Sequence, residues 1–155
     1  MNLTPTFKLA TPGQTVIKGF GSPHVLKSLT TQLGKESEWK ARAILSSWGF
    51  DCIDVGEGFE FDMIVTGRGF SSRVQVKTIG LDGRTRLGRS SQTVRGCKAK
   101  PYGADAFDHL MLIDRDSLSG YLIPADEIIN GDVIRSKVKG SNFLDYSISI
   151  KLTND

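Results

Sequence analysis

Two short stretches near the middle of the chain alternate between apolar and polar residues. They are FDMIV at 61–65 and RVQVK at 73–77. An alternation of period two with β-branched residues is typical of strands, and the intervening residues 66–72 contain two glycines and two serines. The pattern therefore predicts a β-hairpin with a longish loop, whose turn is centred near residues 69 and 70.

This register places Asp62 opposite Lys77 and Ile64 opposite Gln75. Asp62, Gln75 and Lys77 then share one face, within roughly 5 to 8 Å of each other by cross-strand geometry. A carboxylate, an amide and an ammonium group are costly to bury unless they are paired. These three side chains are therefore the first candidates for a functional site.

Residues 29–48, which precede the hairpin, instead show the spacing of apolar residues that is typical of a helix. The apolar stripe consists of Ala41, Ile44, Leu45 and Trp48, and Gly49 is expected to end the helix. The same stripe, followed back from Trp48, reaches Glu38, which should project from the buried face. A lone carboxylate in that position is the second anomaly.

The other segments complete an α/β pattern. We expect strands at 52–55, 109–113, 121–123 and 146–151, an acidic loop at 56–60, a turn at 114–120 and a short helix at 124–129. Residues 1–27 hold three prolines and little periodicity, which predicts an extended N-terminal arm. The 155 residues suit a single domain, 1–155, and no linker divides them.

Charge is distributed unevenly along the chain. The net charge is +3, but the segment from Arg68 to Lys100 holds nine basic residues and one acid, a net charge of +8, and the rest carries −5. Residues 79–103 are rich in glycine and poor in large apolar side chains, so a basic surface excursion is expected there. This asymmetry indicates a polyanionic partner. The candidate contacts are Arg73, Arg84, Arg86, Arg89, Arg95, Lys98 and Lys100.

Several classes of protein are disfavoured by composition. The longest apolar runs fall short of the roughly 18 to 20 residues that span a bilayer, and the N-terminus lacks a signal-peptide pattern. We therefore expect a cytosolic (cytoplasmic) or nucleoid-associated protein without membrane contact. Cys52, Cys97, His24 and His109 are too few and too scattered for a disulfide framework or a zinc site, so structural roles are expected for them.

Glu38 on a helix, Asp62 at the start of a strand and Gln75-x-Lys77 on the next strand resemble the PD-(D/E)XK nuclease superfamily. Residues 34–38, with the helix that follows, look like the first helix of archaeal Holliday junction resolvases. The Gln-x-Lys form, with 107–110 and 121–124, looks more like the endonucleases of this superfamily associated with group I introns. The resemblance covers residues 34–78 and, more loosely, 102–129.

The resemblance implies a restriction-endonuclease-like αβββαβ core, with a mixed central sheet flanked by helices. It implies a metal-dependent DNA endonuclease in which Glu38, Asp62, Gln75 and the Val76 carbonyl hold Mg²⁺, for which Mn²⁺ can substitute. Lys77 would orient or help to deprotonate the attacking water. Double-stranded or branched DNA would be the substrate, and a homodimer or homotetramer is expected, because cutting both strands needs a second active site.

The sequence departs from the superfamily pattern at two positions. Phe61 precedes Asp62 where proline is usual, and Gln75 replaces the usual acid. An amide oxygen can still bind a hard cation, but it brings no charge. The site would therefore carry two carboxylates instead of three.

Simpler interpretations remain open for each element. Asp62 and Lys77 could form a cross-strand ion pair, Glu38 could pair with Arg42 one helical turn later, and a basic, glycine-rich stretch could be a solvated loop. At the level of function, the alternatives to a site-specific homing-type endonuclease are a junction resolvase or other structure-specific nuclease, a degenerate DNA-binding module of the same fold, and a partner-binding α/β domain.

Overall fold

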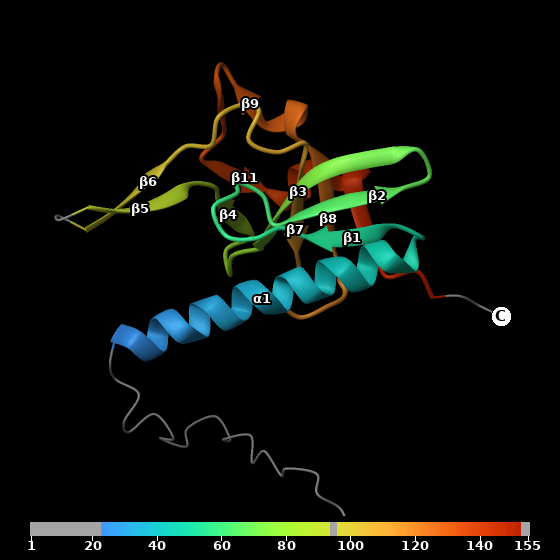
Figure 1. Cartoon of the computed structure of the whole chain (residues 1–155), viewed down its shortest axis with the longest axis horizontal. Helices are drawn as coiled ribbons and strands as arrows, with labels where there is room; N and C mark the ends of the chain where they lie inside the picture. Colours follow the sequence, from blue (N-terminus) through green and yellow to red (C-terminus); the bar gives the residue numbers. More distant parts are fainter. Residues whose placement is uncertain (1–22, 94–95, 153–155) are drawn as a thin grey trace, which may run out of the picture. The chain divides into compact units, whose positions relative to one another are not determined.

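The computed structural model describes residues 23–93 and 96–152, with the backbone alone for 23–30 and 89–99 (Figure 1). The chain divides into two compact units, Met1–Leu33 and Gly34–Asp155. The described part of the first unit is the beginning of a helix, and all the other elements belong to the second. Most of the predicted N-terminal arm, 1–22, lies outside the described residues.

Helix α1 spans Pro23–Ser47. The predicted start at residue 29 and the extended arm up to residue 27 are therefore wrong for residues 23–28. Proline fits the first helical position because the N–H that it lacks would have no partner inside the helix. The predicted stop is confirmed: Gly49 has φ of 87°, and the Phe50 N–H donates to the Leu45 carbonyl at 3.1 Å.

Six strands form the central sheet in the order β1-β2-β3-β7-β8-β12. Their bounds are Asp51–Asp54 (β1), Met63–Gly67 (β2), Phe70–Thr78 (β3), His109–Ile113 (β7), Ser119–Pro124 (β8) and Ser147–Ser149 (β12). All neighbours are antiparallel except β3 and β7, which are parallel. The sheet is therefore mixed, and each predicted strand has a counterpart in it.

The β2–β3 hairpin is tighter than predicted. Gly67 pairs with Phe70, which leaves only Arg68 and Gly69 in the turn, with φ of 52° and 76°. Positive φ at both central residues defines the turn whose twist suits a two-residue hairpin. The predicted loop and register are thus wrong by two residues: continuing the observed register places Asp62 opposite Gln75 instead of Lys77. An even shift keeps every side chain on its predicted face.

The two faces of the sheet bury different cores. On one face, Ala41, Ile44 and Leu45 of α1 pack with Met63, Val65, Val74, Val76, Met111 and Ile113. The other face contributes Leu110, Leu112 and Ile123 to a core with Leu87, Tyr102, Ala106, Phe107, Ala125, Ile128, Ile134 and Val138. Strand β7 contributes apolar side chains to both cores, which explains its nearly continuous apolar sequence.

The second face is covered by short strands and 3₁₀ helices. These elements are β4 (Arg84–Arg86), η1 (Ala125–Ile128), β9 (Ile129–Asn130), β10 (Val133–Ile134), β11 (Lys137–Lys139) and η2 (Gly140–Tyr146). Within the predicted basic excursion at 79–103, β5 (Arg89–Thr93) and β6 (Gly96–Lys100) form a separate two-stranded ribbon. The predicted helix at 124–129 is the single 3₁₀ turn η1.

The predicted fold class, α/β with a mixed central sheet and helix packing, is confirmed. Between β3 and β7, the described residues form strands where the superfamily pattern would place its second α-helix. Within 23–93 and 96–152, no helix combines the length and the apolar character needed to cross a membrane.

Candidate active site

Asp62 lies at the entry to β2 and is fixed by the neighbouring strand. Its Oδ2 accepts a hydrogen bond from the Val76 backbone N–H at 2.8 Å, and its own N–H donates to the Val74 carbonyl at 2.9 Å. Burial raises the pKa of Asp62, against the Val76 hydrogen bond and the Lys77 charge, which lower it. The carboxylate is therefore held in one orientation at an energetic cost.

Glu38 approaches the same place from α1. Burial is the main cause that raises its pKa, and the charge of Asp62 raises it further, while Arg42 and Lys35 lower it. The helix carboxylate and the strand carboxylate are thus close enough to repel each other. The charge of Lys77 in turn acts on Asp62, so the structure places Glu38, Asp62 and Lys77 near one another, and the roles predicted for them stay predictions.

Gln75 is buried, with 6% of its surface exposed. Its side-chain Nε2 donates to the Val76 carbonyl at 3.4 Å. The amide of one predicted metal ligand thus contacts the carbonyl oxygen of another. This interaction is one that the sequence pattern does not reveal, because it depends on the rotamer of Gln75.

A second hydrogen bond joins the elements that carry these groups. The Oγ of Ser37 and the Oγ1 of Thr78 lie 2.5 Å apart, and Ser37 is buried. Ser37 precedes Glu38 on α1, and Thr78 follows Lys77 on β3. This contact therefore fixes the distance between the helix and the strand beside both predicted catalytic groups. Sequence reasoning missed it, because a serine and a threonine 41 residues apart carry no signal of contact.

A cleft of about 230 Å³ opens beside Glu38. It is lined by Lys35, Glu38, Trp39, Arg42 and Asp54. Arg42 forms an ion pair with Asp54 and lies 5.8 Å from the centre of the exposed Trp39 ring. The simpler interpretation, in which Arg42 serves only as the partner of Glu38, is therefore not what the structure shows.

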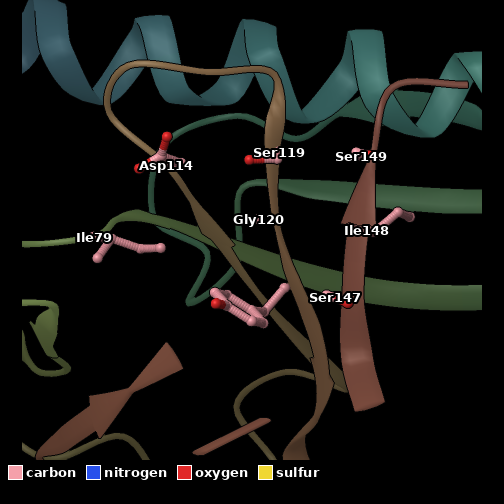
Figure 2. Close-up of a pocket in the computed structure, with 8 residues that line it drawn as sticks. Ile79, Asp114, Ser119, Gly120, Ser147, Ile148 and Ser149 are labelled. Carbon is pink, nitrogen blue, oxygen red and sulfur yellow. The ribbon is translucent and has the colours of Figure 1, made fainter. Parts of the chain in front are cut away.

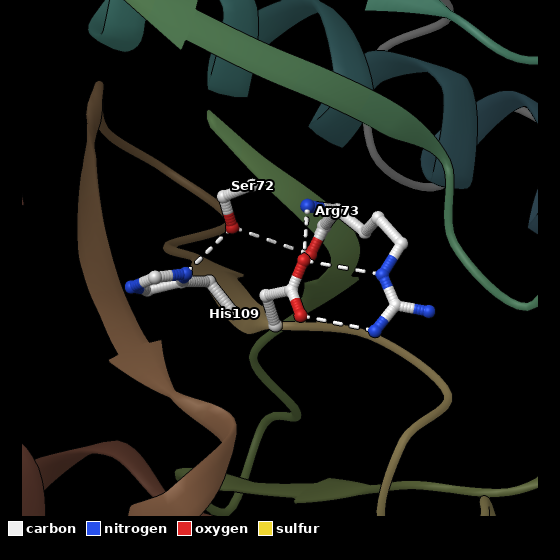
Figure 3. A network of polar contacts seen from close by, with 4 residues as sticks. Ser72, Arg73 and His109 are labelled. Carbon is white, nitrogen blue, oxygen red and sulfur yellow. Dashed lines mark hydrogen bonds and ion pairs between the residues drawn. The ribbon is translucent and has the colours of Figure 1, made fainter. Parts of the chain in front are cut away.

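Arg73, a predicted DNA contact, has a partner within the chain (Figure 3). Its Nε and Nη2 donate to the two carboxylate oxygens of Asp108 at 3.1 and 3.0 Å, and its backbone N–H donates to Oδ2 at 2.8 Å. The hydrogen bonds from Arg73 lower the pKa of Asp108. Arg73 would have to exchange this carboxylate for a phosphate to bind DNA.

His109 lies next to this network and interacts with Ser72. The Ser72 Oγ and the His109 Nδ1 are 2.6 Å apart, and Ser72 is buried (Figure 3). Burial lowers the pKa of His109. The predicted structural role suits these contacts, since a buried hydroxyl in the sheet is not accessible to a substrate.

The basic candidates divide into described and undescribed side chains. Arg84, Arg86 and Lys100 are exposed. Arg89 and Lys98 belong to β5 and β6, where only the backbone is described, and Arg95 lies outside the described residues.

Another hollow, of about 300 Å³, lies over β8 and β12 (Figure 2). Ser119, Ser147, Ser149 and Asp114 bring polar oxygens to it, and Ile79 and Ile148 bring apolar surface. None of the predicted site residues lines it. It therefore adds no chemistry to the site at Glu38 and Asp62.

The donor set suits a hard cation, because carboxylate, amide and carbonyl oxygens are the ligands that Mg²⁺ prefers. Within the described part of the chain, no three His, Cys, Asp or Glu side chains gather closely enough to hold a metal ion. Of the predicted ligands, only Glu38 and Asp62 carry charge, because Gln75 is an amide and Val76 would contribute its carbonyl. The charge of Asp62 disfavours the ionised form of Glu38, and a cation bound beside both would relieve this repulsion.

Comparisons with known proteins bear on the fold. Neither a protein-family model nor a curated protein matches the chain. Among solved structures, a bacterial homing endonuclease, I-Ssp6803I, is similar with a TM-score of 0.58 and 16% sequence identity. The match covers 81% of this chain and 80% of that one. The chain therefore shares the fold of a homing endonuclease over most of its length.

Proposed function

We propose that the protein is a metal-dependent DNA endonuclease of the PD-(D/E)XK type. The observation that carries the proposal is the placement of Glu38, Asp62 and Lys77 around the hairpin: the Ser37–Thr78 hydrogen bond joins α1 to β3 beside Glu38 and Lys77, and the Val76 N–H orients Asp62. The charge of Asp62 also raises the pKa of Glu38. The fold shared with a homing endonuclease supports site-specific cleavage of double-stranded DNA over other nuclease activities.

Glu38, Asp62, Gln75 and the Val76 carbonyl would hold Mg²⁺ or Mn²⁺. Such an ion polarises the scissile phosphate and lowers the pKa of a bound water. The Val76 N–H keeps the Asp62 carboxylate oriented, so that little reorganisation is needed on binding. Lys77 neutralises charge on the phosphate and orients the attacking water. Ser37 and Thr78 hold α1 and β3 together around these groups.

The test is cleavage of a randomised duplex library with Mg²⁺ and with EDTA, followed by sequencing of the fragment ends. Cleavage that requires the metal and gives a consensus at the ends supports a site-specific enzyme. Asp62→Ala should abolish it. Cleavage by purified Asp62→Ala at the wild-type rate would show that the active site lies elsewhere.

Lys77→Ala provides the complementary measurement. It should remove cleavage and leave DNA affinity nearly unchanged, because one phosphate contact is a small part of the electrostatic total. Equal losses of cleavage and affinity would instead indicate that Lys77 serves only to bind DNA.

A catalytically degenerate DNA-binding module is the second candidate, and the Gln75 contact favours it. Its amide donates to the Val76 carbonyl, so two predicted ligands interact with each other. In this case the wild type would bind duplex DNA without cutting it.

Cutting both strands also calls for two active sites, so we propose a homodimer or homotetramer, which light scattering of the purified protein tests directly. Preferential binding of a four-way junction over duplex would favour a resolvase.

A further inference from the structure

Strands β4 and β11 form a two-stranded antiparallel ribbon with an unusual pairing. Arg84 pairs with Lys139, and Arg86 pairs with Lys137, so that two cations face two cations across the ribbon. These partners are separated by about 50 residues in the sequence. We refer to Arg84, Arg86, Lys137 and Lys139 as the basic ribbon.

The inner and outer faces of this ribbon differ sharply. The middle pair, Thr85 and Val138, is buried, with exposed fractions of 4% and 3%. The four basic side chains are exposed. Because residues two apart on a strand share a face, the cations form one outer surface, with Cβ atoms about 7 Å apart along each strand and about 5 Å apart across the pair.

Such an arrangement weakens the isolated fold, because like charges directly opposite each other destabilise a strand pair. None of the four forms an ion pair with an acid in the described part of the chain. The carboxylate of Asp82, the nearest acid in sequence, accepts a hydrogen bond from the backbone N–H of Arg84 at 3.0 Å. The surface therefore has uncompensated positive charge, for which an external polyanion is the natural counterpart.

The ribbon also lies near the proposed catalytic groups. The Gly80 N–H donates to the Arg84 carbonyl at 3.2 Å, and Gly80 is three residues beyond Lys77. A Cβ at Gly80 would lie 2.4 Å from that carbonyl oxygen, so the close approach requires glycine. Three extended residues and one strand spacing place Arg84 at most about 17 Å from Lys77. That is about five base pairs along duplex DNA.

We infer that the outer face of the basic ribbon binds backbone phosphates of duplex DNA next to the cleaved bond, with Lys137 and Lys139 as contacts alongside Arg84 and Arg86. The inference rests on the proposed function and adds a DNA-contacting strand, β11, outside the basic segment 68–100. Lysine ammonium groups act as point charges, so these contacts position the duplex and do not read its sequence.

The experiment is a salt titration of DNA binding by the full chain, measured by fluorescence anisotropy with a labelled mixed-sequence duplex in EDTA. Relative to wild type, Lys137→Gln/Lys139→Gln should reduce the slope of log affinity against log salt by about 1.8, for two lost phosphate contacts. The affinity loss should be equal on unrelated duplex sequences. Arg115→Gln/Lys151→Gln removes the same charge from exposed positions outside the ribbon and should leave the slope unchanged.

Charge reversal separates binding from folding. Lys137→Glu and Lys139→Glu place a carboxylate opposite Arg86 and Arg84, respectively. Thermal stability without DNA should therefore rise, while DNA affinity falls by more than with the glutamine variant. A purely structural role for the lysines would move stability and affinity in the same direction, and that result would overturn the inference.

Three further results of the salt titration would overturn the inference. Wild-type binding with an unchanged slope in Lys137→Gln/Lys139→Gln overturns the ribbon inference and leaves the proposed nuclease function standing. No salt-dependent DNA binding by the wild type overturns both. If Lys137→Gln/Lys139→Gln loses affinity for duplex RNA but keeps its affinity for duplex DNA, the partner of the basic ribbon is RNA and the inference is wrong.

Discussion

The β2–β3 hairpin and the basic ribbon are both antiparallel strand pairs, but they carry charge in opposite ways. In the hairpin, Asp62 is oriented by a backbone N–H and half-buried beside Glu38 and Lys77. In the ribbon, four cations are exposed and face one another, and none of them pairs with an acid among the residues that the structure describes. The cost in the hairpin is desolvation, which a bound cation can offset, whereas the cost in the ribbon is repulsion, which solvent screens and an anion removes. The hairpin is thus suited to a cationic ligand, and the basic ribbon to an anionic one.

Gln75 gives the largest expected effect on this comparison, because it decides whether the hairpin holds a cation. If Gln75 is a neutral ligand, Gln75→Ala should lower metal-dependent cleavage by at least about 100-fold. Gln75→Glu should still fold and bind metal, since its charge would lie beside a dication and Lys77. Both variants should be measured against wild type on one substrate.

Two results would change this interpretation of Gln75. Wild-type activity in Gln75→Ala would remove Gln75 from the site. An inactive wild type that Gln75→Glu restores would assign the protein to the DNA-binding modules.

The pH dependence of stability tests the desolvation cost directly. The pKa values of Asp62 and Glu38 are raised above their ordinary values of 3.8 and 4.5. Their protons therefore stabilise the fold at low pH, and this contribution is lost as the pH rises above those values. In metal-free buffer, Glu38→Gln/Asp62→Asn should become more stable relative to wild type as the pH increases toward neutrality, which denaturant titrations at several pH values would measure.

Metal addition supplies the control for that measurement. Mg²⁺ at neutral pH should raise the melting temperature of wild type and leave Glu38→Gln/Asp62→Asn unchanged, because a ligand stabilises only the state that binds it. An equal increase in both proteins would mean that Mg²⁺ binds elsewhere.

The Arg73–Asp108 pair should contribute less than the buried groups, since both side chains are partly exposed. We expect Asp108→Asn to lower the free energy of unfolding by at most about 1 kcal/mol at neutral pH. The pKa of Asp108 is lowered, so its contribution is present above its ordinary value of 3.8 and is lost as the pH falls. Chemical denaturation of Asp108→Asn and of the exposed control Asp116→Asn would measure it, and equal effects would contradict a specific pair.

The smallest expected effect concerns the inner face of the ribbon. The Thr85 Oγ1 is buried and has no hydrogen-bond partner in the described part of the chain. Thr85→Val, which removes the hydroxyl at nearly constant volume, should stabilise the protein by about 0.5 to 1 kcal/mol. Thr85→Ser keeps the hydroxyl, loses a methyl group and should destabilise it. Thermal melts would measure both variants against wild type. A Thr85→Val protein less stable than wild type would mean that the hydroxyl has a hydrogen-bond partner after all.

The sequence predicted the elements whose pattern is local. Apolar spacing located α1 around Ala41 and Ile44, and an uninterrupted apolar run located β7 with its observed bounds. The alternation in β2 and β3 correctly placed Asp62 and Gln75 on one face. These features need only nearby residues, because a helix or strand repeats its environment every few positions.

Features set by distant residues were not predictable. The β4–β11 pairing joins two three-residue strands with charged ends, in which only Thr85 and Val138 point inward. The hairpin register depended on Arg68 accepting a positive φ, which the sequence Arg-Gly signals far more weakly than Asn-Gly. The Ser37–Thr78 hydrogen bond likewise becomes visible only when α1 and β3 are placed side by side.

The parallel pairing of β3 with β7 has a consequence for the protein during its synthesis. Every residue proposed for catalysis precedes residue 78, whereas Lys77 is aligned with Leu112 on a strand that is translated about 30 residues later. The hairpin is local and can form early, but the buried strand that supports it arrives only after the whole excursion from β4 to β6 has left the ribosome. A partly made chain thus holds every residue proposed for catalysis without the strand that supports them.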